Sequence, residues 1–312
     1  MSQKQLPAHN QATLPPQEVI DFYKVIFNNE LYIDDFDQLL EQIQMVKTNL
    51  YNREYMQAFD NESKRVAYCC RWTPSRTISY AALFSHFPEV LDVITEQSGD
   101  ENGSKILCVG GGAGAELTAI TSIFTPFIHN KSKDDGESNL EVTLVDIADW
   151  DDVVNRIMDQ VKSKWLYKQL WEQYKVKFFN HDILDPISAK GMTPYNELNL
   201  ITLLFTTNEL FKENRAKSLR FLQRLNQECQ SGCLLLIVES AGSFSHITVG
   251  TKKFPIQFLI DTVLVGTRGQ ERKGAWEVVS ENDSIWYRCD DNLDYPIKLE
   301  NMRFFYRLYR KK

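Results

Sequence analysis

Three glycines follow an apolar segment of the chain at alternate positions. Residues 105–109 are mostly apolar, and Gly110, Gly112 and Gly114 come next as G-x-G-x-G. Glycine permits a positive φ in a tight turn, close approach of a ligand to the backbone, or close packing of the next helix. The helix expected at about 113–124 points free N–H groups into this turn. The pattern is typical of a site that binds a cofactor containing adenosine.

Two classes of cofactor fit this turn. With Ala115 the spacing satisfies the dinucleotide fingerprint, whereas G-x-G-x-G resembles motif I of methyltransferases that use S-adenosyl-L-methionine (SAM). A plain strand-to-helix turn without a ligand is the third interpretation. Cys108 stands where many methyltransferases carry an acid, so Glu116 in the first helical turn becomes a candidate cofactor ligand.

A second strand is predicted at 140–147 and ends in an acid. The Asp146 carboxylate, followed by Ile147, is placed to accept hydrogen bonds from both hydroxyls of a ribose. A polar insertion at 129–139 lengthens the usual spacing of about 20 residues from the glycines. The alternative for Asp146 is an ordinary surface acid at a strand end.

A third strand is predicted at 176–184, with Asp182 and Ile183 at its end. Methyltransferases typically read the adenine amino group here with an acid and pack an aliphatic side chain on the ring. A nicotinamide enzyme has no specific need for this pair, so the pair favours SAM.

The fourth strand, predicted at 198–205, runs into the polar segment 206–209. In a doubly wound sheet, residues just past this strand line the substrate mouth at the topological switch point. We therefore expect the chemistry here. Thr206 is a candidate cofactor ligand, and its hydroxyl is too weak a base at neutral pH for proton transfer.

The remaining strand signals determine the fold class. The apolar run within 232–241 suits a strand buried on both faces. Strand-like segments at 276–279, 284–288 and 303–309 follow, without a long helix between the last two. This favours an α/β, Rossmann-like class I methyltransferase fold: a mostly parallel seven-stranded sheet with an antiparallel C-terminal hairpin.

Three regions are expected along the chain. Residues 1–17 are polar and contain prolines, which predicts a flexible arm. Apolar residues at helical spacing over 18–27 and 34–59 predict an N-terminal helical extension or cap that ends near residue 98. Residues 99–312 form the methyltransferase domain.

Cations and aromatics gather at the end of this extension. Arg71, Trp72, Arg76 and Tyr80 lie within a few helical turns, and such a cluster can bind a carboxylate or phosphate and stack on a base. Arg71, Arg76 and Tyr80 are therefore candidate substrate-binding residues. The alternative is a structural clamp that holds the extension to the sheet through Trp72 and ion pairs.

Composition is that of an intracellular enzyme. At 312 residues and 43% hydrophobic, the chain can bury a full core. No apolar run approaches the length of about 20 residues that spans a bilayer, and the N-terminus lacks a signal-peptide core. The six cysteines contain no C-x-x-C and the histidines do not cluster with them, so no metal site is predicted. The expected location is the nucleus, nucleolus or cytoplasm.

Five segments together resemble the fungal 25S ribosomal RNA uridine-N3 methyltransferase family. The likeness runs from about residue 62 to the C-terminus, and 145–150 and 205–211 are its more discriminating parts. The segments are 71–76 (RWTPSR), 109–116 (VGGGAGAE), 145–150 (VDIADW), 205–211 (FTTNELF) and 302–308 (MRFFYRL).

The resemblance implies transfer of the SAM methyl group to N3 of a uracil in large-subunit ribosomal RNA, either naked or in a pre-ribosomal particle. Asn208 would then hold the uracil carbonyl edge, and Glu209 would accept the N3 proton directly or through water. An Asn-Glu pair that begins a helix also works as a cap and dipole complement. A flipped base needs a stacking aromatic, for which Phe205, Phe211 and Phe244 are candidates.

The overall charge argues against RNA. Lys and Arg number 35 against 42 Asp and Glu, a formal charge of −7, whereas RNA-binding domains are more often basic. A local patch, for example from Arg215, Lys217, Arg220 and Arg224, would suffice. The alternatives are a SAM-dependent enzyme that acts on a protein or small molecule, and a nicotinamide-binding Rossmann protein.

Overall fold

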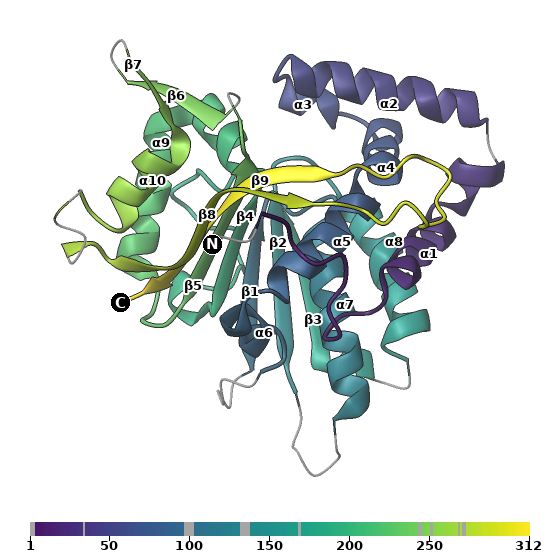
Figure 1. Ribbon diagram of the computed structural model, residues 1–312, viewed down its shortest axis with the longest axis horizontal. Helices are drawn as coiled ribbons and strands as arrows, with labels where there is room; N and C mark the ends of the chain where they lie inside the picture. Colours follow the sequence, from purple (N-terminus) through teal and green to yellow (C-terminus); the bar gives the residue numbers. More distant parts are fainter. Residues whose placement is uncertain are drawn as a thin grey trace.

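The computed structural model describes residues 4–33, 35–96, 103–131, 138–167, 170–242, 245–249, 252–267, 269 and 273–312. Within them, seven strands form one sheet in the order β3-β2-β1-β4-β5-β9-β8 (Figure 1). The strands are β1 (Ser104–Val109), β2 (Leu140–Asp146), β3 (Tyr174–Asn180), β4 (Leu200–Leu204), β5 (Leu234–Ser240), β8 (Trp276–Tyr287) and β9 (Met302–Lys311).

The strand directions confirm the predicted fold class. The strands β1 to β5 run parallel to one another, whereas β9 runs antiparallel to both β5 and β8. The segments predicted at 276–279 and 284–288 form the single strand β8, because register shifts let it continue along β9. A hairpin of β6 (His246–Val249) and β7 (Lys252–Pro255) and the helix α10 (Ile256–Leu264) were not predicted.

The sheet separates two apolar cores. Ile106 and Cys108 of β1 belong to one core, and Leu107 and Val109 belong to the other, as the alternation of side chains along a strand requires. The second core contains buried residues of α9 (Thr207–Glu228) and α10. The first core contains buried residues of α1 (Pro16–Ile26), α2 (Phe36–Tyr51), α4 (Glu62–Arg71), α5 (Thr73–Phe84), α6 (Pro88–Ile94), α7 (Ala115–Asn130) and α8 (Asp151–Gln160).

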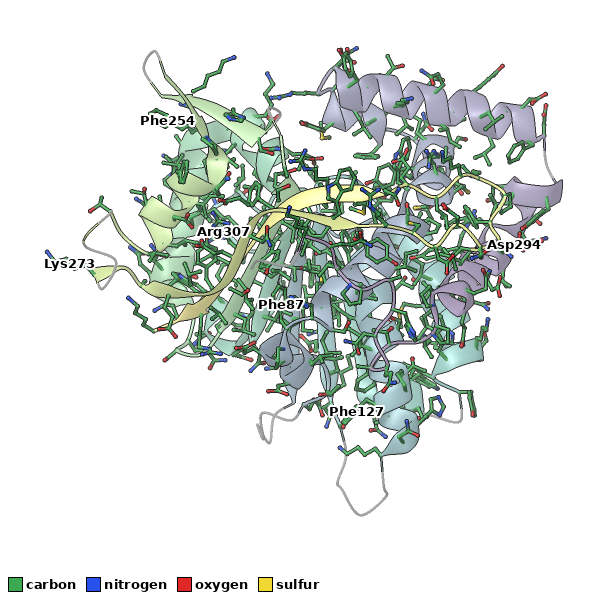
Figure 2. The ribbon with its side chains drawn as sticks, in the orientation of Figure 1. Phe87, Phe127, Phe254, Lys273, Asp294 and Arg307 are labelled. Atoms are coloured by element: carbon green, nitrogen blue, oxygen red, sulfur yellow. The ribbon has the colours of Figure 1, made fainter. Side chains whose placement is uncertain are left out.

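The N-terminal helices therefore share a core with the sheet. The loop between β8 and β9 also fastens to them, because Lys24 Nζ lies 2.6 Å from Asp294 Oδ2 (Figure 2) and the Tyr295 hydroxyl donates to Cys70 O. The junction expected near residues 98 and 99 lies outside the described residues.

From residue 4 onward, the arm expected to be flexible lies against the body of the protein. Leu6 is 1% exposed, and its N–H donates to Trp286 O at 2.8 Å. The Tyr287 hydroxyl donates to Ala8 O, and Leu14 N–H donates to Ser122 O. Burial of one apolar side chain and pairing with a strand give this segment a fixed place that its polar composition did not predict.

Two helices beside the strand ends are interrupted in the structure. The helix expected over 34–59 is broken into α2 and α3 (Tyr55–Ala58), with Arg53 between them at φ 60°. The helix α9 begins at Thr207, just before the Asn-Glu pair, and is interrupted at Asn214, whose side-chain oxygen accepts the N–H of Lys217. In the described part of the chain, no helix has the length and apolar character to cross a membrane.

Candidate cofactor and substrate site

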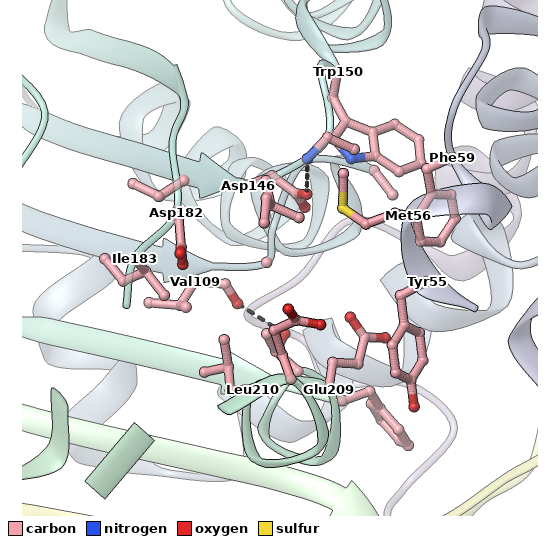
Figure 3. A pocket seen from close by; sticks show the side chains of 18 of the residues that line it. Tyr55, Met56, Phe59, Val109, Asp146, Trp150, Asp182, Ile183, Glu209 and Leu210 are labelled. Atoms are coloured by element: carbon pink, nitrogen blue, oxygen red, sulfur yellow. Dashed lines mark hydrogen bonds between the residues drawn. The ribbon is translucent and has the colours of Figure 1, made fainter. Parts of the chain in front are cut away.

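A cavity of about 440 Å³ opens at the carboxyl ends of β1, β2 and β4 (Figure 3). Its walls come from the glycine turn, the ends of these strands and the start of α9. Residues of α3 close it from the side of the N-terminal helices. Most of the predicted site residues line it: Gly110, Asp146, Ile147, Asp182, Ile183, Thr206, Glu209 and Arg76.

The glycine turn has the steric requirements that the sequence suggested. Gly110 has φ 73°, and a Cβ atom there would lie 2.4 Å from Thr206 Oγ1. A Cβ on Gly112 would lie 2.0 Å from Trp150 Cδ1, and Gly114 has φ 76° as the residue before α7. Thr206 fixes the turn from the other side, because its hydroxyl donates to Val109 O at 2.9 Å.

Asp146 holds the turn and faces the cavity. One carboxylate oxygen accepts the N–H of Gly112 at 3.1 Å, and the other accepts the N–H of Ala148 at 3.0 Å. Burial raises the pKa of Asp146 to about 6 despite these hydrogen bonds. The adjacent Ile147 is 49% exposed and lines the cavity.

Asp182 and Ile183 lie at the same edge, after β3. An Asp182 oxygen accepts the N–H of Leu184 at 2.9 Å, which fixes the carboxylate, and Ile183 is 5% exposed. Figure 3 shows both beside Val109, across the cavity from α3. An acid and an aliphatic side chain are thus present together where an adenine ring would need them.

Glu116 is separate from the main cavity. It is 3% exposed and lines a second cavity of about 30 Å³ beside the glycine turn, together with Arg76 and Tyr80. The hydroxyl of Thr202 donates to its carboxylate at 2.5 Å. Burial nevertheless raises the pKa of Glu116 to about 8. A cationic group bound nearby would favour its ionised form.

The structure separates the two residues proposed for catalysis. Glu209 lines the cavity beside Tyr55 (Figure 3). Burial, followed by the negative charges of Asp146 and Glu239, raises the pKa of Glu209 to about 8, and Arg76 opposes the shift. A carboxylate with its pKa near neutrality is suited to accept a proton.

Asn208 is held away from the cavity. Its backbone N–H donates to Glu239 at 3.0 Å, and its side-chain amide donates to Ser245 Oγ at 3.1 Å. It is not among the residues that line the cavity. The geometry favours a structural role for Asn208, through its bond to Ser245 and not through the helix cap that the sequence suggested.

Replacing Asn208 by alanine is expected to lower stability by about 1 kcal/mol, the typical contribution of one hydrogen bond. Replacing Ser245 should cost about 1–2 kcal/mol, because its hydroxyl also donates to Ser240 O. Because the two side chains share one of these bonds, the double variant should lose less than the sum. Urea unfolding measures the three values. Affinity for S-adenosyl-L-homocysteine (SAH) should stay as in the unchanged protein, and a large loss in Asn208→Ala would return this residue to the binding site.

The cation and aromatic cluster also divides. Arg71 pairs with Glu300 and donates to Lys298 O at 2.8 Å, so it joins α4 to the segment before β9, away from the cavity. Arg76 lines both cavities. Tyr80 is 2% exposed, and its ring lies 6.3 Å from that of Phe205. Within this cluster, Arg71 therefore joins two segments of the fold, whereas Arg76 faces the candidate site.

Of the aromatics considered for stacking on a base, Phe205 lines the cavity, with a backbone φ of 61°. Such an angle is uncommon for a residue other than glycine and is often found at functional sites. Phe211 is buried in the core under α9, and Phe244 lies outside the described residues.

Sequence reasoning missed the wall that α3 provides. Tyr55, Met56 and Phe59 line the cavity, and Phe59 packs on the indole of Trp150 at 5.1 Å. Their only signal was apolar spacing in a predicted helix far from the glycine turn.

The residues present fit SAM. The glycine turn leaves backbone exposed where side chains would fill the space, and two fixed acids with aliphatic neighbours stand at the strand ends. At the other end lie a buried acid and an arginine. These groups match a ligand with an adenine, a ribose and a charged amino acid.

Comparison with known proteins agrees with this geometry. The family model described as "Putative SAM-dependent methyltransferase" matches residues 23–310. The 25S rRNA (uridine(2843)-N(3))-methyltransferase of Saccharomyces cerevisiae (strain ATCC 204508 / S288c) is 55% identical over 324 aligned residues, which cover 98% of this chain and 88% of that protein. Among solved structures, N-methyltransferase NodS from Bradyrhizobium japonicum WM9 in complex with SAH is 14% identical, with a TM-score of 0.40 over 86% of this chain and 98% of NodS. On the family model and the yeast relative, this chain belongs to the SAM-dependent methyltransferase family that includes the yeast 25S rRNA enzyme.

Proposed function

We propose that this protein methylates N3 of a uridine in 25S ribosomal RNA, with SAM as the methyl donor. The observation that carries the proposal is 55% identity to the yeast 25S rRNA uridine-N3 methyltransferase over nearly the whole of both chains. Glu209, a partly buried carboxylate in the cavity, supplies the group that this reaction requires.

The cofactor-binding roles follow from position. Asp146 accepts hydrogen bonds from the ribose hydroxyls, and Asp182 reads the adenine amino group. Ile147 and Ile183 pack on the adenine ring, and both line the cavity. Glu116 attracts the ammonium of the methionine end. Gly110, Gly112 and Gly114 keep the turn open, with Thr206 as their support.

In the transfer, bound SAM supplies an electrophilic methyl carbon on a sulfonium. The protein aligns the acceptor nitrogen with this carbon and removes the N3 proton. The Glu209 carboxylate accepts that proton, directly or through one water. The new N3–C bond forms as the C–S bond breaks, and the electron pair of the C–S bond goes to sulfur. No metal is required for this balance.

Binding of RNA requires cations near the mouth of the cavity, although the whole chain carries a formal charge of −7. Lys212 lines the cavity and is exposed, and Arg215 and Arg220 are exposed further along α9. Arg224 is engaged with Asp185 O, Pro186 O and the Tyr195 hydroxyl. The local patch is therefore assigned to the first part of α9 and not to its whole length.

The test uses purified protein and labelled SAM with two substrates from cells that lack this protein. These substrates are total RNA and pre-ribosomal particles. Together they include RNA from the nucleus, the nucleolus and the cytoplasm. Nucleoside mass spectrometry should find new 3-methyluridine in 25S RNA from at least one of them. Binding of SAH without any methylated nucleoside, together with label in protein or small molecules, would contradict the RNA assignment and favour that alternative substrate class.

A further inference from the structure

Arg76 presents a partly buried guanidinium to the cavity. It lies on α5, with its Cζ atom 5.4 Å from the ring centroid of Tyr68 and 5.1 Å from that of Phe205. These contacts hold the group between two aromatic rings. Among the described residues, the charge of Arg76 interacts electrostatically with Glu209 and Glu239, but its guanidinium forms no direct ion pair and no hydrogen bond.

This contrasts with the arginine that is buried in the sheet. Arg307 has a side chain only 4% exposed and contacts three acids, namely Asp261, Glu281 and Asp283 (labelled Arg307 in Figure 2). An arginine carries five N–H donors, and a charge withdrawn from bulk water is normally paired. Because Arg76 has no direct partner among the described residues and lines both cavities, its donors are available to an anionic ligand.

The position of Arg76 identifies the part of the ligand that it meets. The inference rests on the cofactor-binding roles proposed above, in which Asp182 and Ile183 mark the adenine end of the main cavity and Asp146 marks the ribose. Arg76 lines the main cavity and also the small one beside the glycine turn, which contains none of the α3 residues that close the mouth. The end of SAM beyond the ribose carries the ligand's only carboxylate.

We infer that Arg76 binds the carboxylate of the methionine end of SAM and is not a contact for the RNA. The planar guanidinium matches a carboxylate with two parallel hydrogen bonds. The rings of Tyr68 and Phe205 restrict where the guanidinium can lie, and Phe205 has a φ of 61°. Glu116 lines the same small cavity and would attract the ammonium group of the same amino acid end of SAM.

The test compares two ligands by calorimetry. SAH contains the amino acid end, whereas 5′-methylthioadenosine keeps the adenosine and thioether but lacks it. In Arg76→Met, which keeps the apolar stem, SAH affinity should fall roughly 10- to 100-fold, the range for hydrogen bonds between charged groups. Affinity for 5′-methylthioadenosine should hardly change. The SAH affinity of Arg76→Lys should lie between those of Arg76→Met and the unchanged protein, because lysine keeps the charge but cannot form two parallel hydrogen bonds.

The matched control is Arg310→Met on β9, which removes an arginine paired with Glu89 and should bind both ligands as the unchanged protein does. Equal losses for both ligands in Arg76→Met and Arg76→Lys would mean that Arg76 only shapes the cavity. Unchanged SAH affinity with a raised KM for RNA would make it a substrate contact. Either result overturns the inference. If Arg76→Met fails to fold, the ligand comparison in Arg76→Lys decides.

Discussion

Replacement of Glu209 by glutamine is expected to lower kcat by roughly 10²- to 10⁴-fold, the usual contribution of a general base. Glutamine keeps the shape and cannot accept the N3 proton. SAH affinity should be nearly unchanged, because the binding roles rest on other residues. Single-turnover methyl transfer to 25S RNA measures the loss, and Glu228→Gln, at the exposed end of the same helix, is the control.

The pH dependence gives a second measurement on the same residue. A base with a pKa of about 8 is mostly protonated below that pH, so methyl transfer should rise with pH and level off above about 8. A cation bound near Glu209 would lower its pKa and move the midpoint of this profile to lower pH. A flat profile from pH 6 to about 9, together with full activity in Glu209→Gln, would remove Glu209 from the mechanism.

Stability should respond in the opposite direction. The pKa of Glu209 is higher in the folded protein than in the unfolded chain, so the folded state binds more protons between the model value of 4.5 and about 8. The free energy of unfolding contributed by this group is greatest below that interval and is lost as the pH rises through it. Glu209→Gln should therefore be more stable than the unchanged protein at pH 8, with the difference vanishing near pH 4.5.

Alanine at Gly112 is expected to abolish tight SAH binding and to destabilise the fold by about 1–3 kcal/mol, the usual cost of overpacking. Its Cβ would lie 2.0 Å from Trp150 Cδ1. The indole or the turn must move, and the N–H that Asp146 accepts moves with the turn. Thermal unfolding and calorimetry measure the two effects.

Gly242→Ala is the matched control for Gly112→Ala. It has no heavy atom within 4 Å of the added Cβ, so its stability should change by less than about 0.5 kcal/mol. If Gly112→Ala binds SAH and unfolds as the unchanged protein does, Trp150 can move to accommodate the added Cβ, and the turn does not require glycine at this position.

The strand-end residues could be predicted because sequence order fixes where they meet. Parallel strands bring their carboxyl ends to one edge, so acids after three separate strands had to converge once the strands were identified. Asp146, Asp182 and Glu209 do line one cavity. Their roles as ligand contacts stay predictions.

Helix phase and helix breaks could not be predicted in the same way. Asn208 and Glu209 are neighbours, but successive side chains on a helix point about 100° apart, and only the packing of α9 decides which one faces the cavity. Arg71 and Arg76 fall on different helices because the chain changes direction at Trp72. The break at Arg53 that creates α3 leaves no trace in apolar periodicity.

The wall formed by α3 has a consequence for the order of events during synthesis. Tyr55 and Met56 are made long before Glu209, which lies across the same cavity. At about 5–20 residues per second, the interval is on the order of ten seconds. Until Glu209 has been made, the cavity lacks the wall opposite α3. Phe59 likewise lacks the indole on which it packs until Trp150 has been made. The cofactor can assist folding only late, after α9 has emerged, so the earlier helices form without its help.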